Sequence, residues 1–209
     1  MKDSVYTVQI INGYKNYEKQ KVFEGLNIDF IENHITGILG PSGCGKTTLL
    51  NIISGIESLD KGNLITRCKN ISYIFQEDIL IPWLTVHENI AFVLKSYMNK
   101  KEIDERVYKY LNLVKLKEHK DKFPRELSGG MKRRVAIARA FCHKSSLILM
   151  DEPFKGLDIN LKNEIIKELK QILKYDNRTG ILVTHDINEA KALAHETYYF
   201  KDGSHLIEV

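Results

Sequence analysis

The segment "ITGILGPSGCGKTTLLNIIS", residues Ile35 to Ser54, decides the fold. It opens with a short apolar run, Ile35 to Leu39, of the kind that forms a buried strand. A glycine-rich turn follows, and from Lys46 the apolar residues take helical spacing through Ser54. Strands that alternate with helices are typical of a parallel sheet. The segment therefore predicts an α/β fold built around such a sheet.

The turn itself, "GPSGCGKTT", matches the spacing Gly, four residues, Gly-Lys-Ser/Thr. Backbone N–H groups of such a loop surround the phosphates of a nucleotide, and the helix directs its positive end at them. Lys46 is then placed to reach the β- and γ-phosphate oxygens, and Thr47 to place its hydroxyl on Mg²⁺. A plain glycine-rich turn before a helix is the alternative, and the complete spacing argues against it. The predicted nucleotide contacts are Gly40, Pro41, Ser42, Gly43, Cys44, Gly45, Lys46, Thr47 and Thr48.

A metal-binding acid is expected on a neighbouring strand, and "LILMDEP", Leu147 to Pro153, supplies one. Four apolar residues predict a buried strand with Asp151 at its carboxyl end, where ligands bind in open α/β sheets. Asp151 is the predicted metal ligand, and Glu152 is placed to polarise the attacking water. Taken alone, the two acids could equally begin a helix. The phosphate loop upstream favours the catalytic interpretation.

A histidine follows another apolar strand in "ILVTHD", where His185 comes to the same edge of the sheet. There it can contact the γ-phosphate or the attacking water. A single histidine at a strand end is as often structural, so this assignment depends on the surrounding pattern.

The remaining elements complete the α/β prediction. Strands are expected at Val5 to Ile11 and Val22 to Phe30, with a polar turn from Asn12 to Gln20 between them. Helix formers with spaced apolar positions run from Thr85 to about Phe123. Further expected elements are strands at Ile71 to Phe75, Leu147 to Met150, Ile181 to Thr184 and Tyr198 to Lys201, and helices at Ile159 to Lys174 and Ile187 to His195.

Composition sets limits on the class of protein. Hydrophobic residues make up 43% of the 209 residues, enough for a sizeable core. The net charge of +4 is too small to predict a nucleic-acid partner, and none is expected. The three cysteines are scattered without metal spacing, which favours reduced thiols in a cytosolic protein. No apolar run approaches the ~20 residues of a spanning helix, and no signal-peptide core follows the first residues.

The stretch "LSGGMKRRVAIARA", Leu127 to Ala140, has no obvious use within a single-chain site. Together with the motifs above it resembles the ATP-binding-cassette ATPases over nearly the whole chain. In that family "LSGG" is the signature segment, which closes over the γ-phosphate held by a second cassette in a head-to-tail dimer. The physical chemistry agrees, because Ser128, Gly129 and Gly130 open a helix whose N–H groups and dipole attract an anion.

The resemblance implies a fold and further roles. The fold is a P-loop NTPase core with a mainly parallel sheet, an N-terminal antiparallel β subdomain and an inserted α-helical subdomain. It forms a single ATPase domain over residues 1–209, with the helical signature subdomain at about 85–135 and the rest at 1–84 and 136–209. Gln76, which follows "ISYIF", matches the glutamine that contacts Mg²⁺ and the attacking water. Tyr17 matches the aromatic ring that stacks on adenine, with Tyr14 as the alternative. Catalysis then falls to Glu152, His185 and Gln76, and metal binding to Thr47, Gln76 and Asp151.

Several positions depart from the family pattern or lie beside its motifs. Met131 stands where a polar residue is common, and its side chain is expected to face away from the phosphates. "KGLD", Lys155 to Asp158, matches the D-loop, although Lys155-Gly156 replaces the usual small residues. Lys132, Arg133 and Arg134 are expected on a solvated polar face of the signature helix. Because the chain ends at Val209, regulation by a C-terminal tail is not expected.

Two classes of ATP-binding-cassette protein remain open. Soluble relatives in DNA repair or translation usually carry two cassettes or a long coiled coil, and this chain has neither. The apolar segment "FQEDILIPWLTVHENI", Phe75 to Ile90, suits a docking surface for a transmembrane permease near Gln76 to Trp83. Packing of the segment on its own helical subdomain is the alternative. A small P-loop kinase would not explain Ser128 to Gly130 or His185.

The segment resembles that of importers of nitrate, sulfonates, taurine and thiamine precursors. The expected assembly is two cassettes, taken to be copies of this chain, with permease subunits and, indirectly, an extracytoplasmic substrate-binding protein. The expected location is the cytoplasmic face of the membrane, and the expected cofactors are ATP and Mg²⁺.

Overall fold

The structure is a computed structural model that describes residues 5–18, 20–201 and 206–208. The chain divides into two compact units. Unit 1 comprises Met1–Tyr73, Ser145–Glu152 and Lys170–Val209, and unit 2 comprises Ile74–Lys144 and Pro153–Leu169. The interpretation of the whole chain as one domain stays a prediction.

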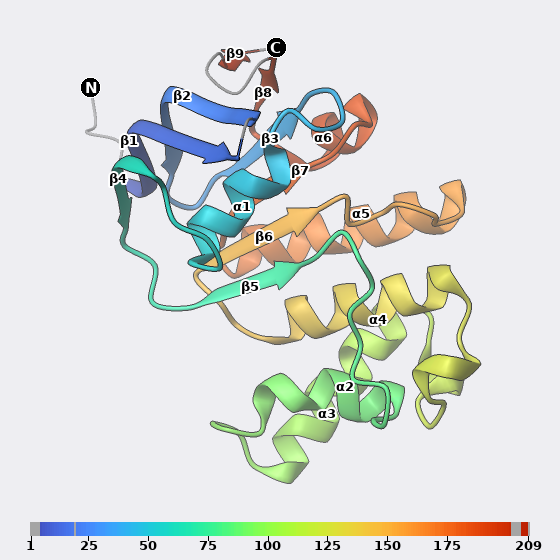
Figure 1. The fold of residues 1–209 in the computed structure, drawn as a ribbon. Helices are drawn as coiled ribbons and strands as arrows, with labels where there is room; N and C mark the ends of the chain where they lie inside the picture. The colour runs from blue at the N-terminus through green and yellow to red at the C-terminus, as the bar shows by residue number, and fades with distance from the viewer. Residues whose placement is uncertain (1–4, 19, 202–205, 209) are drawn as a thin grey trace. The chain divides into compact units, whose positions relative to one another are not determined.

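The strands are β1 (Tyr6–Tyr17), β2 (Gln20–Ile31), β3 (Ile35–Leu39), β4 (Lys61–Thr66), β5 (Ile71–Ile74), β6 (Leu147–Asp151), β7 (Thr179–Val183), β8 (Glu196–Phe200) and β9 (Leu206–Glu208) (Figure 1). The α-helices are α1 (Lys46–Ser54), α2 (Val86–Ala91), α3 (Lys100–Leu113), α4 (Gly129–Cys142), α5 (Ile159–Tyr175) and α6 (Ile187–Leu193). Short 3-10 helices are η1 (Phe92–Leu94), η2 (Lys117–His119) and η3 (Pro124–Glu126).

Two sheets organise unit 1. The first has strand order β2-β1-β4 and is antiparallel. The second has the order β5-β6-β7-β3-β8-β9. In it β3, β6, β7 and β8 run parallel, and β9 pairs antiparallel with β8. The predicted mainly parallel sheet and the N-terminal antiparallel subdomain are both confirmed.

One core joins the two sheets through helix α1, which lies between them (Figure 1). Phe23 and Phe30 of β2 are fully buried, and so are Leu49 and Leu50 of α1. All five residues of β3, β6 and β7 are buried, as is usual for parallel strands covered on both faces. This packing holds the carboxyl ends of these three strands, where the predicted site residues lie, in fixed register.

The predicted turn from Asn12 to Gln20 is wrong. Strand β1 continues to Tyr17 and β2 begins at Gln20, so most of this segment is paired strand. The register shifts between Ile10 and Gly13, and Asn12 has a φ of 50°. Such irregularities allow polar residues and glycine within a pair of strands. A search for alternating apolar and polar residues does not detect strands of this kind.

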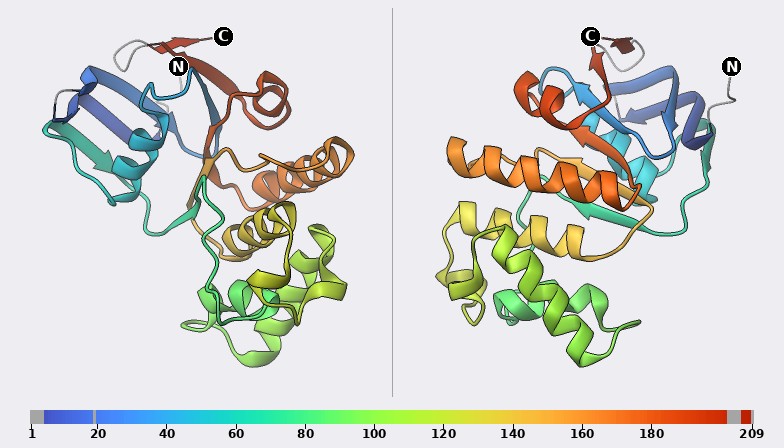
Figure 2. Two further views of the ribbon diagram at one scale, coloured as in Figure 1. Left: turned by 45° about the vertical axis from the view of Figure 1, so that its right-hand side comes forward. Right: turned by 180° about the vertical axis from the view of Figure 1, so that it is seen from behind.

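Unit 2 is helical apart from its connecting segments, and two further views show its helices (Figure 2). Helices α2 and α3 both pack against α4. Their buried residues include Ile90, Val107, Leu111 and Ile137. The expected helical insertion is therefore present. Among the described residues, no helix is both long enough and apolar enough to cross a membrane.

Candidate nucleotide site

The phosphate loop connects β3 to α1 with a backbone that requires glycine. Gly45, the N-cap of α1, has a φ of 102°, and a Cβ there would lie 2.6 Å from Val22. A Cβ on Gly40 would lie 2.4 Å from the carbonyl oxygen of Phe200. These contacts explain why the loop is glycine at both positions. The close approach of a phosphate to this backbone stays a prediction.

Lys46 is the first residue of α1 and is largely buried, with 9% of its surface exposed. Its ammonium group donates hydrogen bonds to the carbonyl oxygens of Gly40 (2.9 Å) and Pro41 (2.7 Å). A buried ammonium needs such partners, and carbonyl dipoles compensate its charge only in part. The side chain therefore curls over the loop, where a phosphate would supply the missing negative charge.

Two of the three predicted metal ligands, Thr47 and Asp151, lie side by side in unit 1. The Thr47 hydroxyl donates a hydrogen bond of 2.7 Å to Oδ2 of Asp151. Asp151 ends strand β6 and has only 1% of its surface exposed. The hydroxyl and the carboxylate come from elements 104 residues apart in the sequence, so the fold brings them together.

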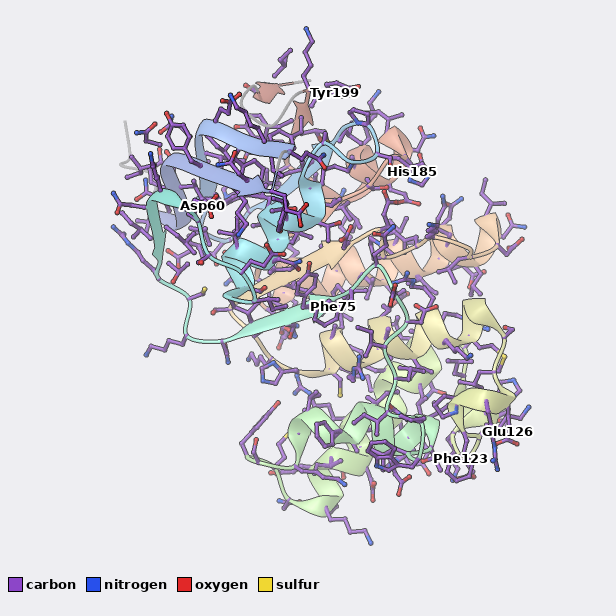
Figure 3. The ribbon with its side chains drawn as sticks, viewed as in Figure 1. Asp60, Phe75, Phe123, Glu126, His185 and Tyr199 are labelled. Carbon is purple, nitrogen blue, oxygen red and sulfur yellow. The ribbon has the colours of Figure 1, made fainter. Side chains whose placement is uncertain are left out.

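Glu152 and His185 form a second pair. Oε2 of Glu152 lies 2.8 Å from Nδ1 of His185. Glu152 has a φ of 48°, in the left-handed region, and its N–H donates to the carbonyl of Val183 at 2.9 Å. Backbone strain at a buried carboxylate is typical of functional sites. The His185 side chain is 69% exposed. Figure 3 labels its position.

The segment that carries His185 is fixed by two residues that the sequence interpretation missed. The buried Thr184 hydroxyl donates to Oε2 of Glu189 at 2.6 Å and accepts from the N–H of Asp186 at 3.1 Å. Glu189 has 6% of its surface exposed. The sequence signal that could have indicated the role of Glu189 is its position as a charged residue on the buried side of a short helix.

The oxygen ligands of this site fit Mg²⁺. A hydroxyl and a carboxylate are hard donors, which Mg²⁺ prefers together with water and phosphate oxygens. The described residues contain no group of three or more His, Cys, Asp or Glu side chains that would hold a metal by itself. Mg²⁺ is usually held by few protein ligands together with water and substrate phosphates, so the lack of such a group among these residues does not argue against Mg²⁺ here.

Tyr17 ends strand β1, and 41% of its surface is exposed. Its hydroxyl donates to Glu57, and the Lys15 ammonium lies 5.1 Å from the ring centroid. Burial and the hydrogen bond to Glu57 raise the pKa of the Tyr17 hydroxyl. The exposed ring retains the surface that stacking needs, and its contact with adenine stays a prediction.

The signature segment and Gln76 belong to unit 2. Ser128 is the N-cap of α4, as predicted, and its hydroxyl accepts from the N–H of Met131 at 3.3 Å. A Cβ on Gly129 would meet nothing within 4 Å, whereas a Cβ on Gly130 would lie 3.3 Å from the carbonyl oxygen of Gly156. The N–H groups of this end point out of the helix, as an anion-binding end requires.

The expected solvated face is wrong for Arg133, whereas Lys132 and Arg134 are partly exposed. Arg133 has 3% of its surface exposed, and its guanidinium donates to the carbonyls of Phe75 (2.6 Å) and Gln76. Arg134 donates to the carbonyl of Val114 at 2.9 Å. The five N–H donors of a guanidinium can bond backbone carbonyls in place of water, so its charge can be buried.

The loop from Gln76 to Trp83 carries exposed apolar side chains. Ile79 has 54% of its surface exposed and Trp83 has 75%. The loop backbone is nevertheless held, because the side chain of buried Asn89 bonds both the N–H (2.8 Å) and the carbonyl (3.1 Å) of Ile81 and the carbonyl of Leu84 (2.9 Å). A fixed backbone with exposed apolar side chains is typical of an interface.

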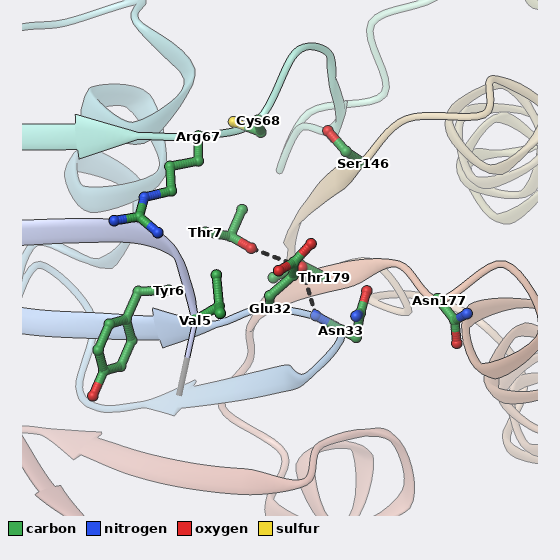
Figure 4. A pocket seen from close by; sticks show the side chains of 10 residues that line it. All are labelled: Val5, Tyr6, Thr7, Glu32, Asn33, Arg67, Cys68, Ser146, Asn177 and Thr179. Atoms are coloured by element: carbon green, nitrogen blue, oxygen red, sulfur yellow. Dashed lines mark hydrogen bonds between the residues drawn. The ribbon is translucent and has the colours of Figure 1, made fainter. Parts of the chain in front are cut away.

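A separate shallow cavity of about 250 Å³ lies at the amino ends of β3, β6 and β7, the edge of the sheet opposite the phosphate loop (Figure 4). Thr179 Oγ1 accepts from the N–H of Asn33 at 2.9 Å and lies 3.1 Å from Thr7 Oγ1. These bonds tie the two sheets of unit 1 together, so the polar floor of the cavity is structural.

Comparison with known sequences places the chain in a family. The profile of the family described as "ABC transporter" matches residues 23–155. The chain is 39% identical over 207 residues to an Fe(3+) ions import ATP-binding protein of Fusobacterium nucleatum and to a spermidine/putrescine import ATP-binding protein of Thermotoga maritima. It is 34% identical over 212 residues to a sulfate/thiosulfate import ATP-binding protein of Pseudomonas aeruginosa.

Each of these three matches covers 94% of the chain. The chain spans 56% of the length of the first two relatives and 64% of the third.

Two solved structures are similar over the whole chain. The ATP-binding cassette MJ0796 in a dimeric post-hydrolysis state bound to ADP and Pi has a TM-score of 0.88 at 31% identity. A second dimeric structure of MJ0796, titled a bacterial ABC transporter cassette, has a TM-score of 0.89 at 31% identity. Each match covers 97% of both chains.

Proposed function

Because the chain belongs to the ABC transporter family, we propose that it is the ATP-hydrolysing subunit that powers an importer of a small solute. It is an ABC ATPase domain in sequence and in fold. The observation that carries the proposal is the pairing of Thr47 with Asp151 and of Glu152 with His185 after the buried strands β6 and β7. These pairs supply a metal site and a group that orients water, which hydrolysis of ATP requires.

In the proposed reaction, residues of the phosphate loop bind ATP, and residues at the ends of the strands promote its hydrolysis. The loop N–H groups and Lys46 hold the phosphates of ATP, and the Tyr17 ring covers adenine. Thr47, Asp151 and Gln76 would hold Mg²⁺, which neutralises charge on the phosphates when bound. Glu152 accepts a hydrogen bond from the attacking water, and His185 holds the carboxylate in place.

The proposed assembly is a pair of cassettes, each presenting Ser128, Gly129 and Gly130 to the γ-phosphate bound by the other. The titles of two solved structures of the similar cassette MJ0796 describe dimers, which supports the arrangement. Closure of the pair would move the permease subunits through the loop from Gln76 to Trp83, at the cytoplasmic face of the membrane. An extracytoplasmic binding protein would deliver the solute.

The transported solute is proposed only by class. The named relatives import iron, polyamines and sulfate or thiosulfate, and the loop from Phe75 to Ile90 resembles that of importers of nitrate, sulfonates, taurine and thiamine precursors. A cassette does not contact the solute, so the permease and its binding protein decide the cargo.

Co-purification of the tagged chain from its native membranes in mild detergent tests the proposal. Partners are identified by mass spectrometry. A multi-spanning partner is the expected result, and its associated binding protein can then be screened for cargo. Recovery only from the soluble fraction, with nucleic acid or ribosomal proteins, would overturn the role in transport and leave the ATPase site unaffected.

A further inference from the structure

The Arg133 side chain is the most fully buried cation of helix α4, and its partners lie outside the helix. Its Nη1 donates to the carbonyl of Phe75 at 2.6 Å and its Nη2 donates to the carbonyl of Gln76. Its Nε lies 3.0 Å from Oδ1 of Asp78, although these two atoms are not aligned as a hydrogen bond. A guanidinium with 3% of its surface exposed thus contacts three residues of one loop, Phe75, Gln76 and Asp78.

A second arginine of α4 holds the next part of the same loop. Arg139 Nη2 donates to the carbonyl of Ile79 at 2.7 Å. The two arginines are six residues apart, or about 9 Å along the helix axis. Helix α4 therefore holds the loop at two separated points, which prevents the loop from pivoting about a single contact.

The same helix begins at the signature segment. Gly129 is the first residue of α4, so Arg133 lies about 6 Å further along the axis. An α-helix is stiff over this distance because each turn is hydrogen-bonded to the next. A displacement of the Ser128 end is therefore passed to the carbonyls of Phe75 and Gln76.

We propose that Arg133 is a positioning residue that fixes Gln76 and the following loop to helix α4, so that the loop follows the signature segment when that segment moves. The inference rests on the proposed function for what moves the signature segment and for what Gln76 and the loop contact. The connection between Arg133 and the loop is a property of unit 2 and can be tested without nucleotide.

The first measurement is hydrogen exchange in the absence of nucleotide. Arg133→Met removes the donors and keeps a long apolar side chain. Peptides covering residues 75–80 are expected to exchange about tenfold faster than in the wild type, because the loop can then open locally. Arg134→Met is the matched control, since Arg134 bonds Val114 and Lys115 instead of the loop. Unchanged exchange in Arg133→Met, or equal acceleration in Arg134→Met, would overturn the proposal.

The second measurement uses the single tryptophan of the chain, Trp83, which lies in the loop with 75% of its surface exposed. With Glu152→Gln to retain ATP, Mg-ATP is expected to change the acrylamide quenching of Trp83. Arg133→Met should abolish that change while ATP binding persists, and Arg134→Met should preserve it.

Each outcome of the second measurement has a distinct meaning. Absence of ATP binding in the parent protein would count against the proposed function alone. ATP binding with the same Trp83 response in Arg133→Met would count against the positioning role alone. If Arg133→Met does not fold, Arg133→Lys replaces it. Its single ammonium should give a hydrogen-exchange rate of the loop that lies between the rate of the wild type and that of a fully released loop.

Discussion

At the scale of single residues, the Lys46 side chain links the shape of the phosphate loop to its chemistry. The ammonium donates hydrogen bonds to two loop carbonyls, those of Gly40 and Pro41. We expect Lys46→Ala to weaken ATP binding at least about tenfold, because charged hydrogen bonds to a buried group contribute about 1.5–3 kcal/mol. Titration with a fluorescent ATP analogue measures the affinity.

The control for this variant is Lys61→Ala, which removes an exposed lysine of β4. Circular dichroism establishes that both variants are folded. Unchanged nucleotide affinity in folded Lys46→Ala would refute the phosphate-loop assignment.

His195 gives a pH dependence at the same scale. Its Nδ1 accepts a hydrogen bond of 2.9 Å from the N–H of Ile35, at the start of strand β3. Burial, followed by the neighbouring charges of His34 and Lys170, lowers the pKa of His195, although Glu196 opposes them. A lowered pKa means that the folded state favours the neutral ring. This stabilisation is complete above the unfolded pKa of about 6.5 and is lost as the pH falls through the lower folded value.

His195→Asn tests this dependence, because an Asn oxygen can accept the same hydrogen bond without titrating. As the pH falls below about 6.5, we expect the free energy of unfolding of the wild type to decrease more steeply than that of the variant. Urea denaturation at several pH values measures both curves. Parallel curves would show that another group is responsible.

The residues that escaped the sequence interpretation share one property. Arg133 lies four and eight residues before the buried Ile137 and Phe141, and Asn89 lies between the buried Val86 and Ile90. Both are polar residues on the apolar stripe of a helix, and binary patterning assigns polar residues to solvent. The motif residues were predictable because a phosphate imposes the same local geometry on any chain. Arg133 and Asn89 form hydrogen bonds with backbone groups of the loop, and a pattern of side chains gives no information about such partners.

At the scale of elements, helix α2 is defined by its first turn. The Thr85 hydroxyl accepts from the N–H of Glu88 at 3.2 Å, and the Glu88 carboxylate accepts from the N–H of Thr85 at 2.8 Å. This reciprocal capping box begins a helix of only six residues, too short to persist by propensity alone. The box comes directly after the loop from Gln76 to Trp83, so it also ends that loop.

Thr85→Ala should lower the free energy of unfolding by about 1 kcal/mol, the usual value of an N-cap. In a chain of this size that corresponds to a decrease of roughly 2–4 °C in Tm. Thr85→Ser keeps the hydroxyl and is the matched control. Calorimetry compares the two variants, and an equal loss in both would assign the effect to the threonine methyl group instead of the cap.

The elements also show where patterning succeeds. Helix α1 was predicted with the bounds that it has, because Gly45 and Gly55 delimit it with left-handed backbones. Strand β4 carried no clear signal, since five of its six residues are exposed and it pairs only with β1. Burial on both faces gives a strand an apolar run, whereas an exposed edge strand leaves little in its sequence to detect.

At the scale of the whole molecule, the two helix ends that are proposed to bind anions belong to different units. Helix α1 begins at the phosphate loop in unit 1, and α4 begins at Ser128 in unit 2. The proposed dimer uses both ends on each nucleotide, one from each copy. In that proposed arrangement each cassette would contribute to two sites, and neither site would be complete in a single chain.

This arrangement predicts that nucleotide retention controls assembly. In Glu152→Gln the amide cannot act as the carboxylate does toward the attacking water, so bound ATP persists and the γ-phosphate stays available to the α4 end of the partner. We expect this variant to sediment as a dimer with saturating Mg-ATP and as a monomer without it. Sedimentation velocity over a range of protein concentrations measures the equilibrium.

Two further variants separate ATP binding from trans capping. Adding Lys46→Ala to Glu152→Gln should abolish both ATP binding and the dimer. Adding Ser128→Arg should abolish the dimer and retain ATP binding, because the new side chain obstructs only the α4 end. A dimer that persists in the Ser128→Arg double variant would mean that the two chains associate through another surface, and the signature segment would then need a different role.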